Sequence, residues 1–358
     1  MGKRDWSWAF LGILALIIRY FAIQNPEATD EIYSRRFFPG IRNVIDLTLG
    51  NLPFPSVYLF MALVFFVLGM FILNFKRKVG WKSRSFFTFR SLANGVGALV
   101  FFFLVLWGFN YQRTPIFQQL GLKPKALNLE QLESEILITQ RLVEQYRGRV
   151  TADTTPITQI LDYPDLERLV RSNMSENLSV LGLNFTGKPR TKQFPPPGFM
   201  RKMGILGIYF PFTGESYIDP TLHPLEQPFT VAHEMAHSYG VTDEGEANFI
   251  AWVICTNSDD PLLRYSGHLR LLLYQMRDYY RMAPDEYKAW VKNISPGIRN
   301  DLNSIREASE AIQPFSLELS RRSNDIFLKS QGVKAGVNSY QQLPMLAFSW
   351  RKRMNLKD

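Results

Sequence analysis

Two of the four histidines in the chain lie four residues apart, at His233 and His237, with Glu234 between them. This stretch matches the pattern H-E-x-x-H. Because residues i and i+4 share one face of an α-helix, both imidazoles can reach one metal ion. A glutamate beside that ion is placed to act as general base on a bound water. The pattern therefore predicts a zinc site, with Glu234 in the catalytic role.

A zinc site needs at least three protein ligands, so a carboxylate is expected close by. Thr242 is the expected N-cap of the next predicted helix, and Glu244 and Glu246 near its start are the two candidates. Either carboxylate could instead only complement the helix dipole. Glu244 shares a helical face with Asn248, whereas Glu246 points with Ile250. Spacing alone leaves the choice between them open.

The motif and the segment 244–251 resemble the gluzincin metallopeptidases. In that group the third ligand is a glutamate on a second helix, often in an E-x-x-x-D or E-x-x-A-N context. The resemblance implies Glu244 as the ligand, with Asn248 as the residue that supports it. Because the two helices are closer in sequence here than in most gluzincins, Glu246 remains the alternative. The wider segment 207–237 resembles an uncharacterised family of bacterial membrane proteins (domain of unknown function 3810), for which no substrate is established.

Three apolar spans precede the motif, at about residues 6–23, 54–75 and 92–109. Each approaches the roughly 20 residues that an α-helix needs to cross a bilayer. The first span lacks a small-residue cleavage site and contains Arg19, which argues for a retained anchor over a signal peptide. We therefore expect a membrane domain of three transmembrane helices over residues 1–110 and a second domain over residues 111–358.

The formal net charge of +9 does not indicate nucleic-acid binding, because the basic residues flank the apolar spans. Basic residues crowd the link 76–90 and also precede the first span, at Lys3 and Arg4. The positive-inside rule then places the N-terminus in the cytoplasm of a bacterial inner membrane and the second domain in the periplasm or outside the cell. The expected partners are the lipid bilayer and a peptide or protein substrate, without nucleic acid.

Sequence patterns predict a second domain that is mainly α-helical with a small β part, an α+β zincin-like fold. Two β-prone runs precede the motif on either side of a Pro/Gly turn, as in an ordinary hairpin or as in a zincin edge strand that binds extended peptide. Loop structure is expected over 188–200 and a frayed tail over 345–358. The remaining predicted helices are 129–147 with Asn128 as cap, 164–182, 263–282 and 304–331.

Two further residues are candidates for chemistry, and a third residue is not. Tyr265 and His268 could polarise a substrate carbonyl or stabilise an oxyanion, although a packed tyrosine with a helix-terminal histidine is the simpler interpretation. The lone Cys255 lies in an apolar pattern and is expected to be a buried thiol, neither a ligand nor a nucleophile.

The favoured hypothesis is a membrane-anchored zinc metallopeptidase that hydrolyses peptide bonds through a metal-activated water. One alternative is a zinc amidase acting on another envelope amide. Another is a catalytically inactive zincin-fold membrane protein in envelope assembly or sensing, against which the intact Glu234 argues. An intramembrane protease is disfavoured because the motif lies far from the apolar spans.

Overall fold

The computed structural model describes residues 5–159, 161–183, 186–331 and 342–355. The chain divides into two compact units. Unit 1 comprises Met1–Thr114 together with Phe210–Glu215, and unit 2 comprises the rest. The sequence predicts a turn between two β-prone runs at residues 210–215 and carries no sign that this segment belongs to the N-terminal unit.

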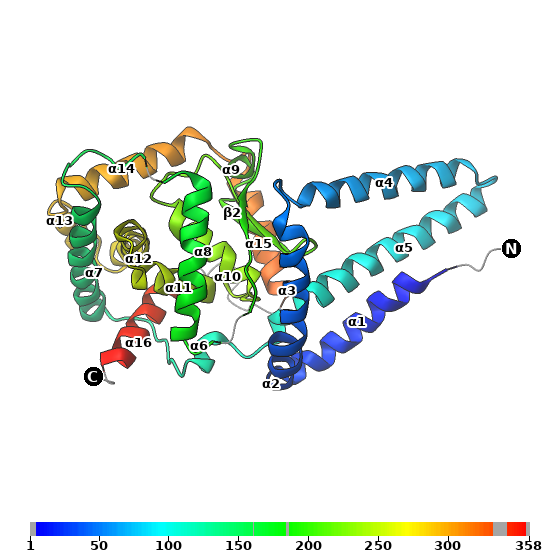
Figure 1. The fold of residues 1–358 in the computed structure, drawn as a ribbon, viewed down its shortest axis with the longest axis horizontal. Helices are drawn as coiled ribbons and strands as arrows, with labels where there is room; N and C mark the ends of the chain where they lie inside the picture. Colours follow the sequence, from blue (N-terminus) through cyan, green and yellow to red (C-terminus); the bar gives the residue numbers. More distant parts are fainter. Residues whose placement is uncertain (1–4, 160, 184–185, 332–341, 356–358) are drawn as a thin grey trace. The chain divides into compact units, whose positions relative to one another are not determined.

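Three long apolar helices form most of unit 1 (Figure 1): α1 (Ser7–Gln24), α4 (Val57–Lys76) and α5 (Trp81–Leu106). The most apolar 18-residue stretches of these helices have mean hydropathies of 1.6, 2.4 and 1.8, and few of the residues in these stretches are buried. Length and composition thus confirm the prediction of three membrane-spanning helices. The third helix was predicted too short, because α5 continues through the basic residues Lys82 and Arg84 before its apolar part. Hydropathy does not detect that first part, although basic residues are good helix formers.

Helices α1 and α5 approach each other through two glycines. A Cβ placed on Gly12 would lie 2.5 Å from the Gly97 Cα, and a Cβ on Gly97 would meet the Trp8 backbone. Small residues at such a crossing let two membrane helices pack backbone against backbone, where dispersion contacts replace a hydrophobic driving force.

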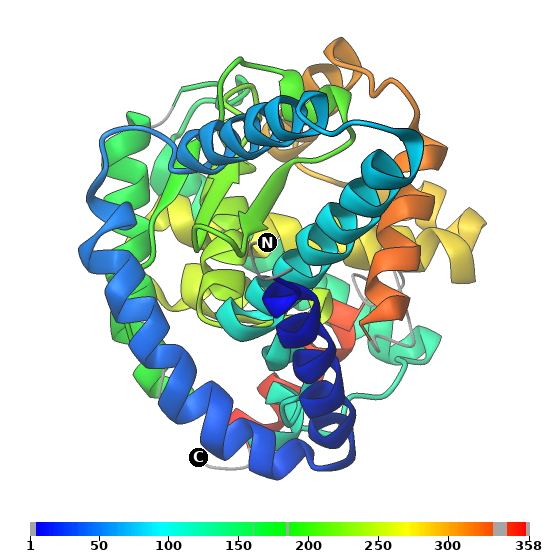
Figure 2. The same ribbon diagram turned by 90° about the vertical axis from the view of Figure 1, so that its right-hand side faces the viewer.

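Between α1 and α4 the chain runs crosswise to the three long helices (Figures 1 and 2). This connection comprises α2 (Pro26–Thr29), the π-helical turn η1 (Asp30–Phe37), α3 (Phe38–Leu47) and the 3₁₀ turn η2 (Leu49–Asn51). A further 3₁₀ turn, η3 (Gly108–Gln112), follows α5. Arg42 of α3 is fully buried, pairs with Asp46 at 2.6 Å and donates to the Gly214 carbonyl.

Other contacts hold the segment 210–215 within unit 1. The backbone N–H and the hydroxyl of Ser56 donate to Glu215 Oε2 at 2.8 and 2.9 Å. The ring of Phe60 in α4 packs against Phe210 and Phe212 at centroid distances of 5.1 and 4.9 Å. Gly214 has φ +63°, a conformation that favours glycine. Hydrogen bonds and aromatic contacts thus fix this segment on α3 and α4.

Unit 2 is mostly helical, with a three-stranded sheet in the order β1-β3-β2. The strands are β1 (Thr191–Gln193), β2 (Gly207–Phe210) and β3 (Glu215–Ile218), with β1 parallel to β3. The helices are α6 (Ile116–Gln119), α7 (Leu129–Val150), α8 (Tyr163–Val180), α9 (Phe199–Lys202), α10 (Gln227–Ser238), α11 (Glu244–Asn257), α12 (Pro261–Met282), α13 (Pro284–Val291), α14 (Pro296–Ala311), α15 (Leu317–Ser330) and α16 (Leu343–Asn355).

Two groups of buried apolar side chains organise unit 2. The α10–α11 core joins these two helices to α8 and α16, and Met174, Met235 and Ile254 are among its buried members. The α7–α12 core joins α7, α12 and α14, and Val143 and Leu272 are among its buried members. Helices α10 and α11 are therefore buried on nearly all sides, which fixes the positions of the residues at their facing ends.

Several predicted elements are confirmed and others are corrected. Asn128 caps α7, as predicted, and the structure adds a reciprocal capping box with Gln131. The predicted helix 304–331 is two helices, because Pro314 interrupts the turn between α14 and α15. The expected loop 188–200 contains β1 and α9, and the expected frayed tail is α16, whose Leu346 is fully buried. Residues 356–358 of that tail lie outside the described residues.

Candidate metal centre

The H-E-x-x-H motif lies on α10, a helix with clear start and stop signals. Pro228 lies in the first turn, where its missing N–H costs no hydrogen bond. Gly240 follows the last turn with φ +85° and donates to the His237 carbonyl. Every residue from Pro228 to Ser238 is buried except Thr230, which is partly exposed. The helix therefore presents its two imidazoles from a rigid frame.

The cap of α11 determines which of the two glutamates faces the histidines. Asp243 is the N-cap, accepting a hydrogen bond from the Glu246 N–H at 3.0 Å. Thr242, which sequence reasoning favoured as the cap, lies one residue too early. Glu246 turns away from α10, because its Oε1 accepts from the Phe117 N–H at 3.0 Å. Glu244, the first residue of the helix, extends back toward α10.

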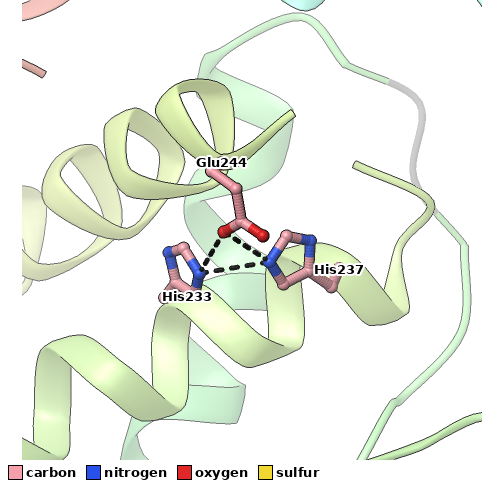
Figure 3. A group of neighbouring side chains, drawn as sticks. All are labelled: His233, His237 and Glu244. Carbon is pink, nitrogen blue, oxygen red and sulfur yellow. Dashed lines mark hydrogen bonds and ion pairs between the residues drawn. The ribbon is translucent and has the colours of Figure 1, made fainter. Parts of the chain in front are cut away.

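Three side chains converge between the two helices (Figure 3). Glu244 Oε2 lies 3.1 Å from His233 Nε2 and 3.3 Å from His237 Nε2. The two Nε2 atoms are themselves 3.1 Å apart, and the rings meet edge to face. The structure thus brings together His233, His237 and Glu244, but not Glu246.

The donor set and its dimensions fit a zinc ion. At zinc–ligand distances of about 2.0–2.1 Å, neighbouring ligand atoms of a tetrahedral site lie about 3.3 Å apart, close to all three distances in the cluster. His237 Nδ1 contacts the Val241 carbonyl at 2.7 Å, and an N–H donated there leaves the Nε2 lone pair directed at the other two groups. Two imidazole nitrogens and one carboxylate are a common catalytic zinc set.

Electrostatics show that the cluster attracts positive charge. Burial disfavours the imidazolium form of His237, but the Glu244 carboxylate overcomes this effect and raises the pKa of His237 to about 9. Burial also disfavours the carboxylate of Glu244, yet His237 holds its pKa well below the usual range. Burial lowers the pKa of His233, which favours the neutral ring that a metal needs.

Glu234 lies beside the histidines with a carboxyl group that has little room. The side chain is buried, its Oε2 has no hydrogen-bond partner among the described residues, and burial raises its pKa to about 8. Gly207 of the edge strand β2 faces it: a Cβ there would lie 2.7 Å from the Glu234 carboxyl carbon. Ser216 Oγ donates to the Glu234 backbone carbonyl at 2.8 Å and fixes this turn of the helix.

The other candidate residues have separate environments. Asn248 Nδ2 donates to the Tyr274 hydroxyl at 3.3 Å. The hydroxyl of Tyr265 donates to Asp301 Oδ2 at 2.6 Å within the α7–α12 core. His268 stacks on a tyrosine ring at 5.5 Å, and burial lowers its pKa to about 3. The structure therefore does not bring Tyr265 or His268 into the cluster. Cys255 is a buried free thiol, as predicted.

Sequence reasoning overlooked one charged residue near the cluster. Arg270 of α12 lies over the ring of Phe229, one helical turn before His233. The sequence feature that could have indicated Arg270 is the helical spacing of Arg270, Tyr274 and Arg277, which places them on one face.

Comparison with known families agrees with the resemblance seen in the sequence. Residues 33–348 match the family described as "Protein of unknown function (DUF3810)". The chain belongs to this family. The match covers most of the chain, including α4, α5 and the whole H-E-x-x-H region, and its description assigns no activity. No curated protein and no solved structure matches the chain.

Proposed function

We propose that this protein is a membrane-anchored zinc metallopeptidase with a zincin-like domain facing away from the cytoplasm. The observation that carries the proposal is the convergence of His233, His237 and Glu244 beside a buried Glu234. Chance seldom buries two imidazoles, a carboxylate and a second carboxyl group together, because uncompensated buried charge is costly. Perturbed acid–base groups gathered in this way are typical of functional sites.

In this proposal His233, His237 and Glu244 hold the ion through two Nε2 atoms and one carboxylate oxygen. A bound zinc ion supplies a Lewis acid that polarises a carbonyl and lowers the pKa of a coordinated water to about 7. His237 keeps its orientation through Val241, and Glu244 through the capped start of α11. The protein thus contributes three ligands whose backbones are fixed before metal binds.

Glu234 is the proposed general base. Its carboxylate accepts the proton of the attacking water and then delivers that proton to the leaving amine. Because Gly207 has no side chain, the Glu234 carboxyl group can occupy the space beside the edge strand.

The test uses the full-length protein in detergent. Metal content measured by mass spectrometry should be about one zinc per chain. It should be lost in the variants His237→Ala and Glu244→Ala and kept in the control Glu246→Gln. A screen of quenched fluorescent peptides then compares the parent with Glu234→Gln, which should keep zinc and lose about 10²- to 10⁴-fold in kcat.

Each outcome separates the hypotheses. Zinc retained by Glu244→Ala would refute the ligand assignment, and unchanged hydrolysis by Glu234→Gln would refute the mechanism. A folded parent without metal would favour an inactive zincin-fold protein in envelope assembly or sensing. Zinc binding with cleavage of a non-peptide envelope amide would favour the amidase alternative.

A further inference from the structure

Arg270 of α12 is a half-buried cation whose hydrogen-bonding capacity is only partly used. A guanidinium has five N–H donors in a planar fork. The ring of Tyr274 packs against it, and Glu226 lies 3.6 Å from Nη1, beyond hydrogen-bonding distance. Nε has no acceptor among the described residues although it is buried. The guanidinium can therefore donate hydrogen bonds to another oxyanion.

Aromatic rings hold this guanidinium in place. Its central carbon lies 5.7 Å from the ring of Phe229 and 5.4 Å from the ring of Tyr274. The exposed Arg277, about two turns after Arg270 on α12, has its central carbon 5.1 Å from the same tyrosine ring. Arginines fixed against aromatic faces present planar donors with little loss of rotamer entropy, which suits carboxylate recognition.

The position of Arg270 relates it to the metal cluster. Phe229 and Glu226 precede His233 by four and seven residues on α10, about 6 and 10 Å along the helix axis. An extended peptide spans about 3.3 Å per residue, so Arg270 lies about two or three residues from a bond placed at the cluster.

Glu226 is a weak competitor for this cation. Burial raises the pKa of Glu226 although Arg270 and Arg201 oppose that effect. The Glu226–Arg270 ion pair contains no hydrogen bond. A substrate carboxylate that forms two parallel hydrogen bonds with the Arg270 guanidinium would therefore displace Glu226.

We propose that Arg270, assisted by Arg277, forms a subsite that binds a carboxylate of the substrate two or three residues from the cleaved bond. The inference rests on the proposed function for the position of that bond, but the subsite itself does not depend on the metal. The carboxylate is either the C-terminus of a peptide or an acidic side chain. The protein would then prefer acidic or C-terminal peptide segments over neutral internal ones.

The experiment measures binding to the full-length Glu234→Gln protein, which prevents turnover, by isothermal titration in detergent. Three probes are used: acetyl-Ala-Ala as the free acid, the same dipeptide as its amide, and acetyl-Ala-Glu amide. A charge-assisted hydrogen bond corresponds to about 10- to 100-fold in affinity. We expect the free acid, the acidic side-chain peptide or both to bind tighter than the neutral amide by about this factor.

Variants locate the preference. Adding Arg270→Gln should abolish the preference for acidic over neutral peptides, and Arg270→Lys should keep part of this preference. The exposed Arg277→Gln should reduce the preference without affecting folding. The exposed Arg306→Gln on α14 is the matched control and should leave it unchanged. Equal affinity for acidic and neutral peptides, no binding of any probe, or a preference that survives Arg270→Gln would overturn the inference.

Zinc content is measured on the same samples, so the two proposals fail separately. A carboxylate preference in a protein that binds no zinc would keep the subsite and refute the metallopeptidase. Zinc binding without a carboxylate preference would refute the subsite and leave the metallopeptidase proposal standing.

Discussion

Gly207 provides a sharp test of how the catalytic carboxyl group is placed. In the variant Gly207→Ala, the new Cβ would lie 2.7 Å from both Cγ and Cδ of Glu234. Ordinary contact needs about 3.5–4.0 Å, so the carboxyl group must move by about 1 Å. Because the far end of Glu234 lacks a partner on Oε2, the side chain is expected to move and the strand to stay. A displacement of 1 Å costs about 10²-fold in rate, and the overpacking costs about 1–3 kcal/mol of stability.

The assay compares Gly207→Ala with Gly148→Ala, an exposed position on α7 where an added Cβ meets nothing within 4 Å. For both variants we would measure zinc content, melting temperature and kcat/KM on a peptide that the parent cleaves. We expect both to keep zinc, because the ligands are untouched, and only Gly207→Ala to lose activity. Equal kcat/KM for the two variants would refute the placement of Glu234 against the edge strand.

Three further outcomes are expected. Chelation should lower the melting temperature, since a ligand at 1,000 times its Kd contributes about 4 kcal/mol, and added zinc should restore it; no change on chelation would argue against a resident metal. Asp301→Ala leaves buried Arg147 and Tyr265 without their shared acceptor and should cost about 3–5 kcal/mol, against almost nothing for exposed Asp285→Ala. Burial raises the pKa of Asp219, but four hydrogen bonds outweigh this effect and hold it below 3.8. This stabilisation is present above the pKa of the unfolded chain and is lost as the pH falls through the folded value, so Asp219→Asn should flatten the acid side of a stability–pH profile.

Local patterns in the sequence were sufficient to predict the parts of the site that depend on one helix. His233 and His237 lie four residues apart, so the repeat of an α-helix alone places both on one face. The choice between Glu244 and Glu246 needed more, because a shift of one residue in the N-cap would rotate the start of α11 by about 100°. Asp243 caps the helix where Thr242 was expected, and that difference determines which carboxylate faces α10.

Features made by distant segments were not accessible in the same way. Arg270 looks like an ordinary helix-surface arginine until α12 is packed beside α10. The tail around Leu346 is short and basic at its end, and only the packing of α16 into the α10–α11 core makes it a helix. Hydropathy likewise predicted the apolar parts of the membrane helices, but not the basic first turns of α5.

The segment 210–215 has a consequence for how such a protein can evolve. A domain that is continuous in sequence can be exchanged between genes by a single recombination event on each side. Here unit 1 takes six residues from the middle of unit 2, and it holds them through Ser56, Phe60 and a buried Arg42. A hybrid that combined the C-terminal part with a different anchor would leave Glu215 without its serine donor and two phenylalanines without their aromatic partner. Unit 1 and the domain that carries His233, His237 and Glu244 are therefore expected to have been inherited together, and the single family match over residues 33–348 agrees with this.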